Sequence, residues 1–252
     1  MTINGEDLAL LRIDLKCDCC GKTFSVSKAY VDFMGGLEFV PQRCGECFDK
    51  EMRRRQEENQ KKIKEQLTEL YMLDLNLTPD IKNASFGNFQ PQSERQTKAF
   101  EYAKEFVTND DYIVILYGRT GTGKSHLAVS MLREWCSKDE PRCGYTTEKE
   151  IFYDCTKTIS SKSTTIDSVL DKYINYDQLV IDELGRAEPS PFKKENLLEI
   201  ITQRLERKKK TVIIGNMTTE TLVAYFSDAV LSRMKAGGHS FLFTEEDYRS
   251  KK

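Results

Sequence analysis

A glycine-rich stretch of eight residues carries the clearest chemical signal in the sequence. Gly118 to Ser125 reads GRTGTGKS and fits the pattern G-x-x-x-x-G-K-S in full. Glycines at these positions allow successive backbone N–H groups to approach phosphate oxygens closely. In this pattern Lys124 reaches the β and γ phosphates of a nucleotide, and the Ser125 hydroxyl binds Mg²⁺. The stretch therefore predicts a nucleotide-phosphate site, and a glycine-rich turn without a ligand is the alternative.

The residues predicted to bind the nucleotide run through this loop and one position beyond it. They are Gly118, Arg119, Thr120, Gly121, Thr122, Gly123, Lys124, Ser125 and His126. For His126, which follows the motif, a packing role is the alternative.

Two adjacent acids follow a short apolar run later in the chain. In LVIDE, Asp182 and Glu183 come directly after three apolar residues. A carboxylate at the end of a strand beside a phosphate loop can hold Mg²⁺, and its neighbour can polarise an attacking water. The pair predicts hydrolysis, with Asp182 on the metal and Glu183 on the water. An ordinary acidic turn at a strand end is the alternative.

A third polar residue ends another apolar run. TVIIGN finishes with Asn216, where a sensor of the γ-phosphate or of the lytic water would lie. Asparagine at a strand end is also common turn chemistry, so both interpretations stay open.

Five of the eight cysteines lie between Cys17 and Cys47. Two C-x-x-C pairs, with residues 21–43 between them, lie near the usual zinc spacing. The predicted ligands are Cys17, Cys20, Cys44 and Cys47. Four thiolates form a closed site, so we expect Zn²⁺ to be structural here, with free or redox thiols as the alternative. Cys19 leaves a second chelating pair with Cys17 open.

These sites need elements that position them, and composition divides the chain into three parts. Residues 1–48 read as a small zinc-binding module, 49–78 as a charged linker helix, and 79–252 as the main domain. From Ala84 onward, apparent helices alternate with short β-rich runs, which predicts an α/β fold with a mostly parallel sheet flanked by helices.

Charge and hydropathy exclude two classes of protein. The net charge of −2 rules out a generally basic nucleic-acid binder, so any such binding must come from a local patch. The apolar runs are far shorter than the roughly 20 residues of a membrane span, and the first residues lack the pattern of a signal peptide. We expect a cytoplasmic protein without a membrane partner.

The order of phosphate loop, DE strand and strand ending in Asn resembles that of an AAA+ ATPase. The finer likeness is to the DnaC/DnaI-type replicative helicase loaders and the related IstB transposition ATPases, over residues 85–249. It rests on SFGNF, YGRTGTGKSHLA, LVIDELG, VIIGN, LSRM and FLFTEEDYRS. Few residues follow Phe243, so the resemblance implies an AAA+ P-loop fold without a C-terminal helical lid.

The resemblance also implies a residue that acts between subunits. In the resembling proteins the arginine of the SRM-like segment reaches a neighbour's γ-phosphate, which makes Arg233 the candidate and implies self-association through the ATP interface. The alternative is an arginine that pairs with Asp228 or faces solvent. Phe86 and Phe89 are candidates for the adenine site, with core packing as the alternative.

Two further roles come from the resemblance. The long segment between Cys143 and Asp177 corresponds to a single-stranded DNA path, where an individual residue can equally lie on a plain solvated helix. Its candidate contacts are Lys149, Phe152, Tyr153, Lys157 and Lys162. The DnaI-type loaders carry a zinc-stabilised helicase-binding domain, and that role transfers to residues 1–48 by position only.

Together these features predict an ATPase that uses ATP, Mg²⁺ and Zn²⁺ to load a replicative hexameric DNA helicase onto single-stranded DNA. An IstB-like transposition ATPase is one alternative. An adaptor switched by ATP with little turnover is the other.

Overall fold

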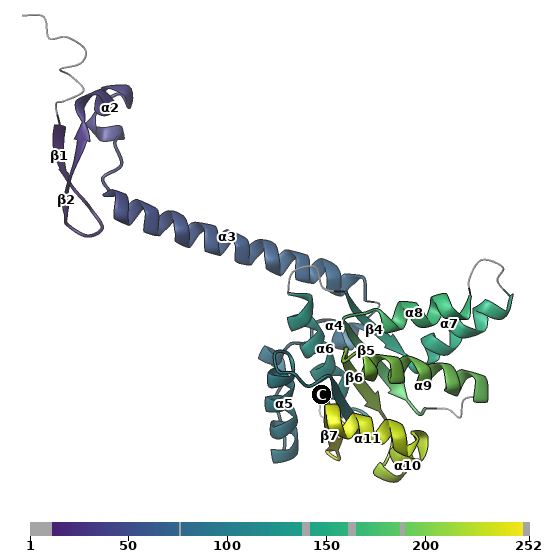
Figure 1. The fold of residues 1–252 in the computed structure, drawn as a ribbon. Coiled ribbons are helices and arrows are strands. Elements are labelled where there is room, and N and C mark those ends of the chain that lie inside the picture. Colours follow the sequence, from purple (N-terminus) through teal and green to yellow (C-terminus); the bar gives the residue numbers. More distant parts are fainter. Residues whose placement is uncertain (1–11, 76, 138–141, 161–164, 187–189, 249–252) are drawn as a thin grey trace, which may run out of the picture. The chain divides into compact units, whose positions relative to one another are not determined.

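The structure is a computed structural model that describes residues 12–248 apart from 76, 138–141, 161–164 and 187–189. The chain divides into two compact units, Met1–Lys64 and Glu65–Lys252. We call them the cysteine module and the nucleotide unit. Helix α3 (Gly45–Leu73) contributes its first part to one and its last part to the other (Figure 1). The division predicted at residues 48 and 78 stays a prediction.

The cysteine module is built on one antiparallel hairpin. Its elements are β1 (Arg12–Lys16), β2 (Thr23–Ser27), α2 (Lys28–Phe33), the 3-10 turn η1 (Leu37–Phe39) and the start of α3. β2 confirms the short strand expected at KTFSV. Within the described part of the module, the buried apolar and cysteine side chains are Cys17, Val31, Val40 and Cys44. Such a small core contributes little stability by apolar burial alone.

Helix α3 is polar over most of its length. Ile63 is 57% exposed, and the buried side chains of the helix are Thr68 and Met72, near its end. Met72 packs into the apolar core of the nucleotide unit. The expected solvated helix is therefore present, with an anchored C-terminal turn.

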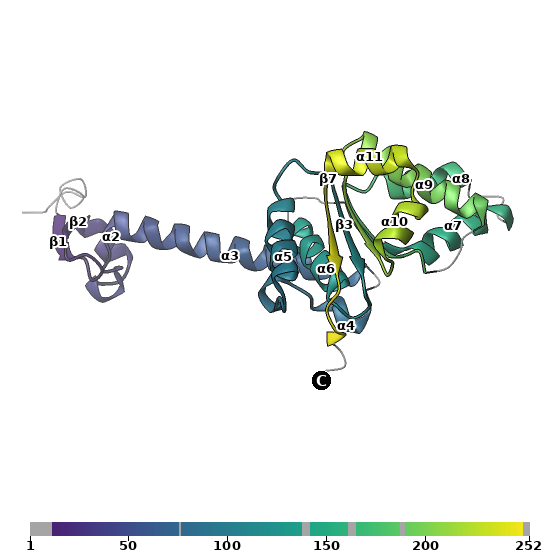
Figure 2. The ribbon, with the colours of Figure 1, turned by 90° about the horizontal axis from the view of Figure 1, so that it is seen from below.

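The nucleotide unit contains a five-stranded sheet whose strands all run parallel (Figure 2). The strands are β3 (Ile113–Gly118), β4 (Cys143–Thr147), β5 (Gln178–Leu184), β6 (Lys210–Gly215) and β7 (Gly238–Phe243). Their order across the sheet is β4-β5-β6-β3-β7. This confirms the predicted α/β fold with a parallel sheet.

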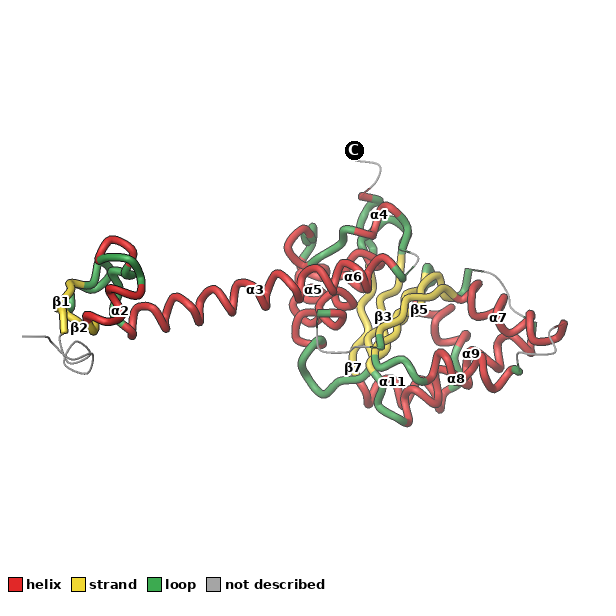
Figure 3. The backbone as a smooth tube through the Cα atoms, turned by 90° about the horizontal axis from the view of Figure 1, so that it is seen from above, coloured by secondary structure: helices red, strands yellow, loops and turns green. Residues whose placement is uncertain are grey.

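Helices cover both faces of this sheet, as parallel strands require for their crossovers. Figure 3 shows α5 and α6 on one face and α7, α8, α9 and α11 on the other. The helical elements are α4 (Pro79–Lys82), η2 (Phe86–Asn88), α5 (Glu94–Phe106), α6 (Lys124–Cys136), α7 (Glu148–Ser160), α8 (Ile166–Ile174), α9 (Pro191–Glu206), α10 (Thr219–Tyr225) and α11 (Asp228–Gly237). Every helix among the described residues is too short or too polar to cross a bilayer.

Strand β3 shows why its sequence is apolar throughout. All of its residues are buried. Val114 and Leu116 join the core under α5 and α6, while Ile115 and Tyr117 join the core on the opposite face. Successive side chains of a strand point to opposite faces, so a strand covered on both sides must be apolar at every position. The carboxyl ends of the parallel strands then meet at one edge of the sheet, where ligands of open α/β sheets bind.

Candidate nucleotide site and cysteine cluster

The phosphate loop connects the end of β3 to the start of α6, as the motif predicts. Gly118, Gly121 and Gly123 have φ values of 124°, 75° and 91°, in the region that favours glycine. A Cβ atom on Gly118 would collide with the carbonyl oxygen of Phe243, and one on Gly121 with the carboxylate of Asp247. The backbone conformation and the close neighbours therefore both require glycine in this loop.

Lys124 is buried inside the loop and bonded to its backbone. Its ammonium group donates to the carbonyl oxygens of Gly118 at 3.2 Å and Arg119 at 2.5 Å. Burial lowers the pKa of Lys124 to about 8, against the opposing attraction of the Asp182 and Glu245 carboxylates. A nucleotide phosphate would supply a negatively charged partner for this buried ammonium group, so the loop fits a phosphate ligand.

The two predicted Mg²⁺ ligands lie in direct contact. The Ser125 hydroxyl donates to Asp182 Oδ2 at 2.7 Å. The same oxygen accepts a hydrogen bond from the Tyr145 hydroxyl at 2.6 Å, and Asp182 Oδ1 accepts one from the backbone N–H of Glu183 at 2.6 Å. Asp182 is thus a buried carboxylate held by donors from three elements, with oxygen ligands of the kind that Mg²⁺ prefers.

Tyr145 is a member of this group that the sequence did not indicate. It lies on β4, beside Val180 of β5. Burial, together with the neighbouring Asp182 carboxylate, raises the pKa of Tyr145 well above its usual range, so the phenol remains a donor. A tyrosine in the short run CGYTT carries no signal of this contact, because the contact depends on which strand neighbours β5.

Glu183 lies in an irregular part of β5. Its φ is 60°, and the register of β5 with β6 shifts between Ile181 and Leu184. The Glu183 carboxylate is 37% exposed and forms an ion pair with Arg186 at 2.5 Å. The irregular backbone therefore gives the two adjacent acids different surroundings. Asp182 is buried beside Ser125, whereas Glu183 is accessible to solvent.

Asn216 directly follows β6, the strand between β5 and β3. Gly215 pairs with Tyr117 on one side and with Leu184 on the other. The exposed Asn216 therefore lies at the same sheet edge as the phosphate loop and the acid pair.

Arg233 lies on α11 and forms an ion pair with Glu206 Oε1 at 2.8 Å, at the end of α9. Both side chains are about half exposed. The sequence had suggested Asp228 as the alternative partner of this arginine. The pair with Glu206 holds Arg233 on the surface of its own chain.

His126 connects α6 to the segment before α5. Its Nε2 lies 2.8 Å from Asn88 Oδ1 and 3.2 Å from the carbonyl oxygen of Ser85. Burial lowers the pKa of His126, which favours the neutral ring. These contacts support the packing alternative for His126.

Phe86 and Phe89 both pack on Phe100 of α5, with ring centroids 5.8 and 5.5 Å apart. Phe89 also lies beside Gly123, where its ring would be 3.0 Å from an added Cβ. Both rings thus pack against α5, Phe89 also borders the phosphate loop, and a role of either in binding adenine stays a prediction. Lys162, a candidate DNA contact from the sequence, lies outside the described residues.

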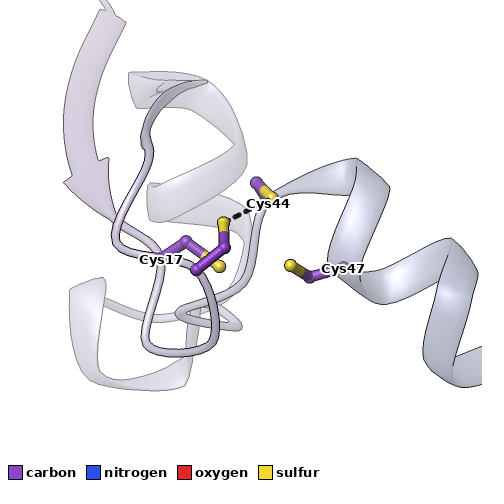
Figure 4. Close-up of side chains that lie close together, drawn as sticks. Cys17, Cys44 and Cys47 are labelled. Carbon is purple, nitrogen blue, oxygen red and sulfur yellow. Dashed lines mark hydrogen bonds between the residues drawn. The ribbon is translucent and has the colours of Figure 1, made fainter.

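The four predicted zinc ligands come together in the cysteine module, and Figure 4 labels three of them, Cys17, Cys44 and Cys47. The sulfur atoms of Cys17, Cys20, Cys44 and Cys47 all lie within 4.8 Å of one another, and those of Cys20 and Cys44 are 3.7 Å apart. A tetrahedral Zn²⁺ with Zn–S bonds of about 2.3 Å places its sulfurs roughly 3.8 Å apart, so this arrangement fits zinc. Cys19 is exposed and is outside the group.

The elements around the cluster explain how distant cysteines meet. Cys17 follows β1, and its N–H and carbonyl groups bond to Lys22 and Gly21 in a tight turn. Cys44 directly precedes α3, and Cys47 lies in the first turn of that helix. The backbone of Cys44 lowers the pKa of the Cys17 thiol to about 6. The turn and the helix start thus present two pairs of sulfurs to one point.

Comparisons with known proteins agree with this geometry. The profile of the family described as IstB-like ATP binding protein matches residues 45–252. The replicative helicase loader DnaC of Escherichia coli (strain K12) is 28% identical over 179 residues, covering 69% of this chain and 73% of that relative. A crystal structure of the DnaC helicase loader superposes with a TM-score of 0.58 at 23% identity, covering 66% of this chain and 100% of the other.

The replication initiator DnaA bound to AMPPCP and single-stranded DNA superposes with a TM-score of 0.57 at 21% identity, covering 68% of this chain and 52% of the other. These structures share the AAA+ P-loop fold, and the described residues after β7 form no α-helical lid. The match of the family profile over most of the sequence establishes that the chain belongs to the IstB-like ATP binding proteins.

Proposed function

We propose that the protein is an ATP-dependent loader of a replicative DNA helicase onto single-stranded DNA. The observation that carries the proposal is the joining of the phosphate loop to the buried Asp182 through Ser125, in a chain similar to DnaC. A helicase loader acts where the chromosome is replicated, so we place it in the cytoplasm.

Each side chain of the site has a distinct part in ATP hydrolysis. Lys124 would donate to the β and γ phosphates in place of the loop carbonyls, and Ser125 and Asp182 would hold Mg²⁺. The metal ion, when bound, neutralises charge on the phosphate oxygens. Glu183 accepts the proton of the attacking water, and Asn216 orients that water or the γ-phosphate.

Arg233 completes the site of a neighbouring subunit in this proposal. A guanidinium group placed on the γ-phosphate stabilises the charge that develops in the transition state. Because Arg233 is paired with Glu206 in the single chain, it must exchange this carboxylate for a phosphate when subunits associate. ATP hydrolysis then depends on self-association.

The cysteine module is the proposed binding site for the helicase. Zn²⁺ bound by the four thiolates would fix a fold that has little apolar core. Outside that core, Tyr30, Phe33 and Leu37 are 41%, 84% and 45% exposed. We propose that these exposed apolar side chains contact the helicase, as apolar residues do at protein interfaces.

Helix α7 is the proposed contact with single-stranded DNA. Tyr153 is 60% exposed, and the ammonium group of Lys157 lies 4.4 Å from its ring centroid. An exposed aromatic ring can stack on a nucleic-acid base, and a neighbouring ammonium group can bind the adjoining phosphate. Asp154 is paired with Lys172 at 2.9 Å, which offsets its negative charge, whereas Phe152 packs against the core.

The proposal is tested by mixing the full chain with the replicative helicase of its own cell. We expect a complex by light scattering, and we expect ATP to be needed for transfer of the helicase to circular single-stranded DNA. Absence of a complex at micromolar concentrations would contradict the loader function.

The family profile, described as IstB-like, makes a transposition ATPase the second candidate. A pulldown that offers both the helicase and a transposase from the same cell distinguishes the two. Preference for the transposase supports the second candidate.

A further inference from the structure

The segment after β7 crosses the phosphate loop. We call residues 244–248 the C-terminal strap. At one end, the Arg119 N–H donates to the carbonyl oxygen of Phe243 at 2.9 Å. At the other, the Tyr248 N–H donates to the carbonyl oxygen of Gly121 at 2.9 Å. One backbone hydrogen bond at the end of β7 and one at Tyr248 thus hold the two ends of this segment against the phosphate loop.

Glu245, the second residue of this strap, contacts the start of α5. Its Oε1 accepts a hydrogen bond from the Ser93 hydroxyl, which also caps the N-terminus of α5 by accepting from the Gln96 N–H at 3.1 Å. The carboxylate also acts electrostatically on the buried Lys124. Glu245 therefore connects the strap to α5 beside the phosphate loop.

The second oxygen of this carboxylate has no hydrogen-bond partner in the part of the chain that the structure describes. Glu245 Oε2 is the buried side-chain polar atom that lacks a hydrogen bond among the described residues. A buried acceptor without a donor costs about 1–3 kcal/mol, and more when it is charged. Such an atom beside a nucleotide site indicates a donor that the ligand brings.

The chemistry of a nucleotide limits what this donor can be. Ionised phosphate oxygens only accept hydrogen bonds and repel a carboxylate. The donors of a nucleotide are its ribose hydroxyls and the amino group of its base, and ribose hydroxyls commonly bond to carboxylates in nucleotide-binding folds. Of these two donors, the ribose hydroxyl is therefore the one that a buried carboxylate oxygen is expected to bind.

We propose that Glu245 is a nucleotide-binding residue whose free carboxylate oxygen accepts a hydrogen bond from a ribose hydroxyl. The strap then closes the nucleoside side of the site, in a fold whose described part has no helical lid. This inference rests on the proposed ATP site and adds a residue that recognises the sugar.

The experiment measures binding of Mg²⁺-ATP, 2′-deoxy-ATP and 3′-deoxy-ATP to the full chain by calorimetry. We expect the wild type to prefer ATP over one of the deoxy analogues by roughly tenfold, as for the loss of a hydrogen bond to a charged group. Glu245→Ala should bind ATP more weakly by roughly the same factor. This variant should also bind ATP and the discriminated deoxy analogue with equal affinity. Glu246→Ala removes the same charge one position away and should keep both the affinity and the preference.

Two results with Glu245→Ala would overturn the proposal: an unchanged affinity for ATP, or a higher affinity caused by relief of charge repulsion. A third comes from purine riboside triphosphate, which lacks the amino group of adenine. If the wild type loses affinity for this nucleotide and Glu245→Ala does not, the carboxylate binds the base amino group and not the ribose. Glu245→Gln keeps a carbonyl acceptor and the contact with Ser93, so it should retain part of the preference even if the alanine variant folds poorly. Failure of the wild type to bind ATP contradicts the proposed function itself, whereas normal binding with an indifferent Glu245 contradicts only this inference.

Discussion

The nucleotide unit and the cysteine module position their sites by different means. In the nucleotide unit, two layers of buried apolar side chains hold the strands whose ends carry the phosphate loop and Asp182. In the module, the buried residues are few and include two of the four cysteines themselves. The nucleotide site is positioned by a large apolar core, so it can form without its ligand. The cysteine cluster supplies two of the few buried side chains of its module, so the fold of that module depends on the metal that the sulfurs bind.

Zinc removal should have the largest effect on stability, and it should unfold the cysteine module without changing the nucleotide unit. With Cys44→Ser, or with a chelator, we expect the cysteine module to unfold, because apparent zinc-binding energies of about 10–16 kcal/mol are folding energies in such sites. Zinc content and proteolysis of residues 1–64 measure this result, while ATP binding by the nucleotide unit should be unchanged. Cys19→Ser is the control and should retain zinc. Loss of ATP binding together with zinc would contradict the independence of the two units.

Glu183→Gln should give the next largest effect, on turnover. Removing the proposed general base should lower ATP hydrolysis by about 10²- to 10⁴-fold while ATP binding persists, because general-base catalysis contributes that much. Phosphate release, measured with single-stranded DNA and the helicase present, provides the readout. Equal rates in the wild type and the variant would instead favour an adaptor that is switched by ATP.

Lys124→Ala should weaken ATP binding by roughly 10²- to 10³-fold, because a buried charge pair with the phosphates is lost. Zinc content should stay at the wild-type level. The exposed Lys98 on α5 provides a matched control, and Lys98→Ala should bind ATP normally. Normal ATP binding by Lys124→Ala would exclude the phosphate loop as the site.

The pH dependence of ATP binding provides a second test of whether the charged form of Lys124 binds the phosphates. The pKa of Lys124 is about 8 in the free chain, and ATP binds the charged form, so affinity should be constant below that pH and fall above it. The slope should approach tenfold per pH unit once the lysine is mostly neutral. Titration calorimetry between about pH 7 and 9.5 measures it. Lys124→Arg remains charged throughout this range and should show no such fall; a fall in that variant would assign the effect to another group.

The smallest effect is expected on the polar part of α3. Ile63→Ala should change the unfolding free energy of either unit by less than about 0.5 kcal/mol, because this side chain is exposed. Met72→Ala, at a buried position of the same helix, should cost the nucleotide unit about 2–5 kcal/mol. Denaturant unfolding followed separately for each unit gives both numbers. Similar losses at the two positions would mean that α3 is packed along its whole length.

The sequence by itself determined the features whose geometry is local. The phosphate loop needs eight contiguous residues with glycine at the positive-φ positions, so its backbone conformation is encoded where the ligand binds. The apolar runs determined the parallel sheet, because strands covered on both faces must be apolar at every position. The cysteine spacing likewise indicated the cluster.

Only the tertiary structure decided the contacts between distant segments. The order of strands places Tyr145 on Asp182, the meeting of α9 and α11 pairs Arg233 with Glu206, and the path after β7 brings Glu245 to Ser93. No local pattern specifies these contacts, because each depends on which elements the sheet and its helices bring side by side.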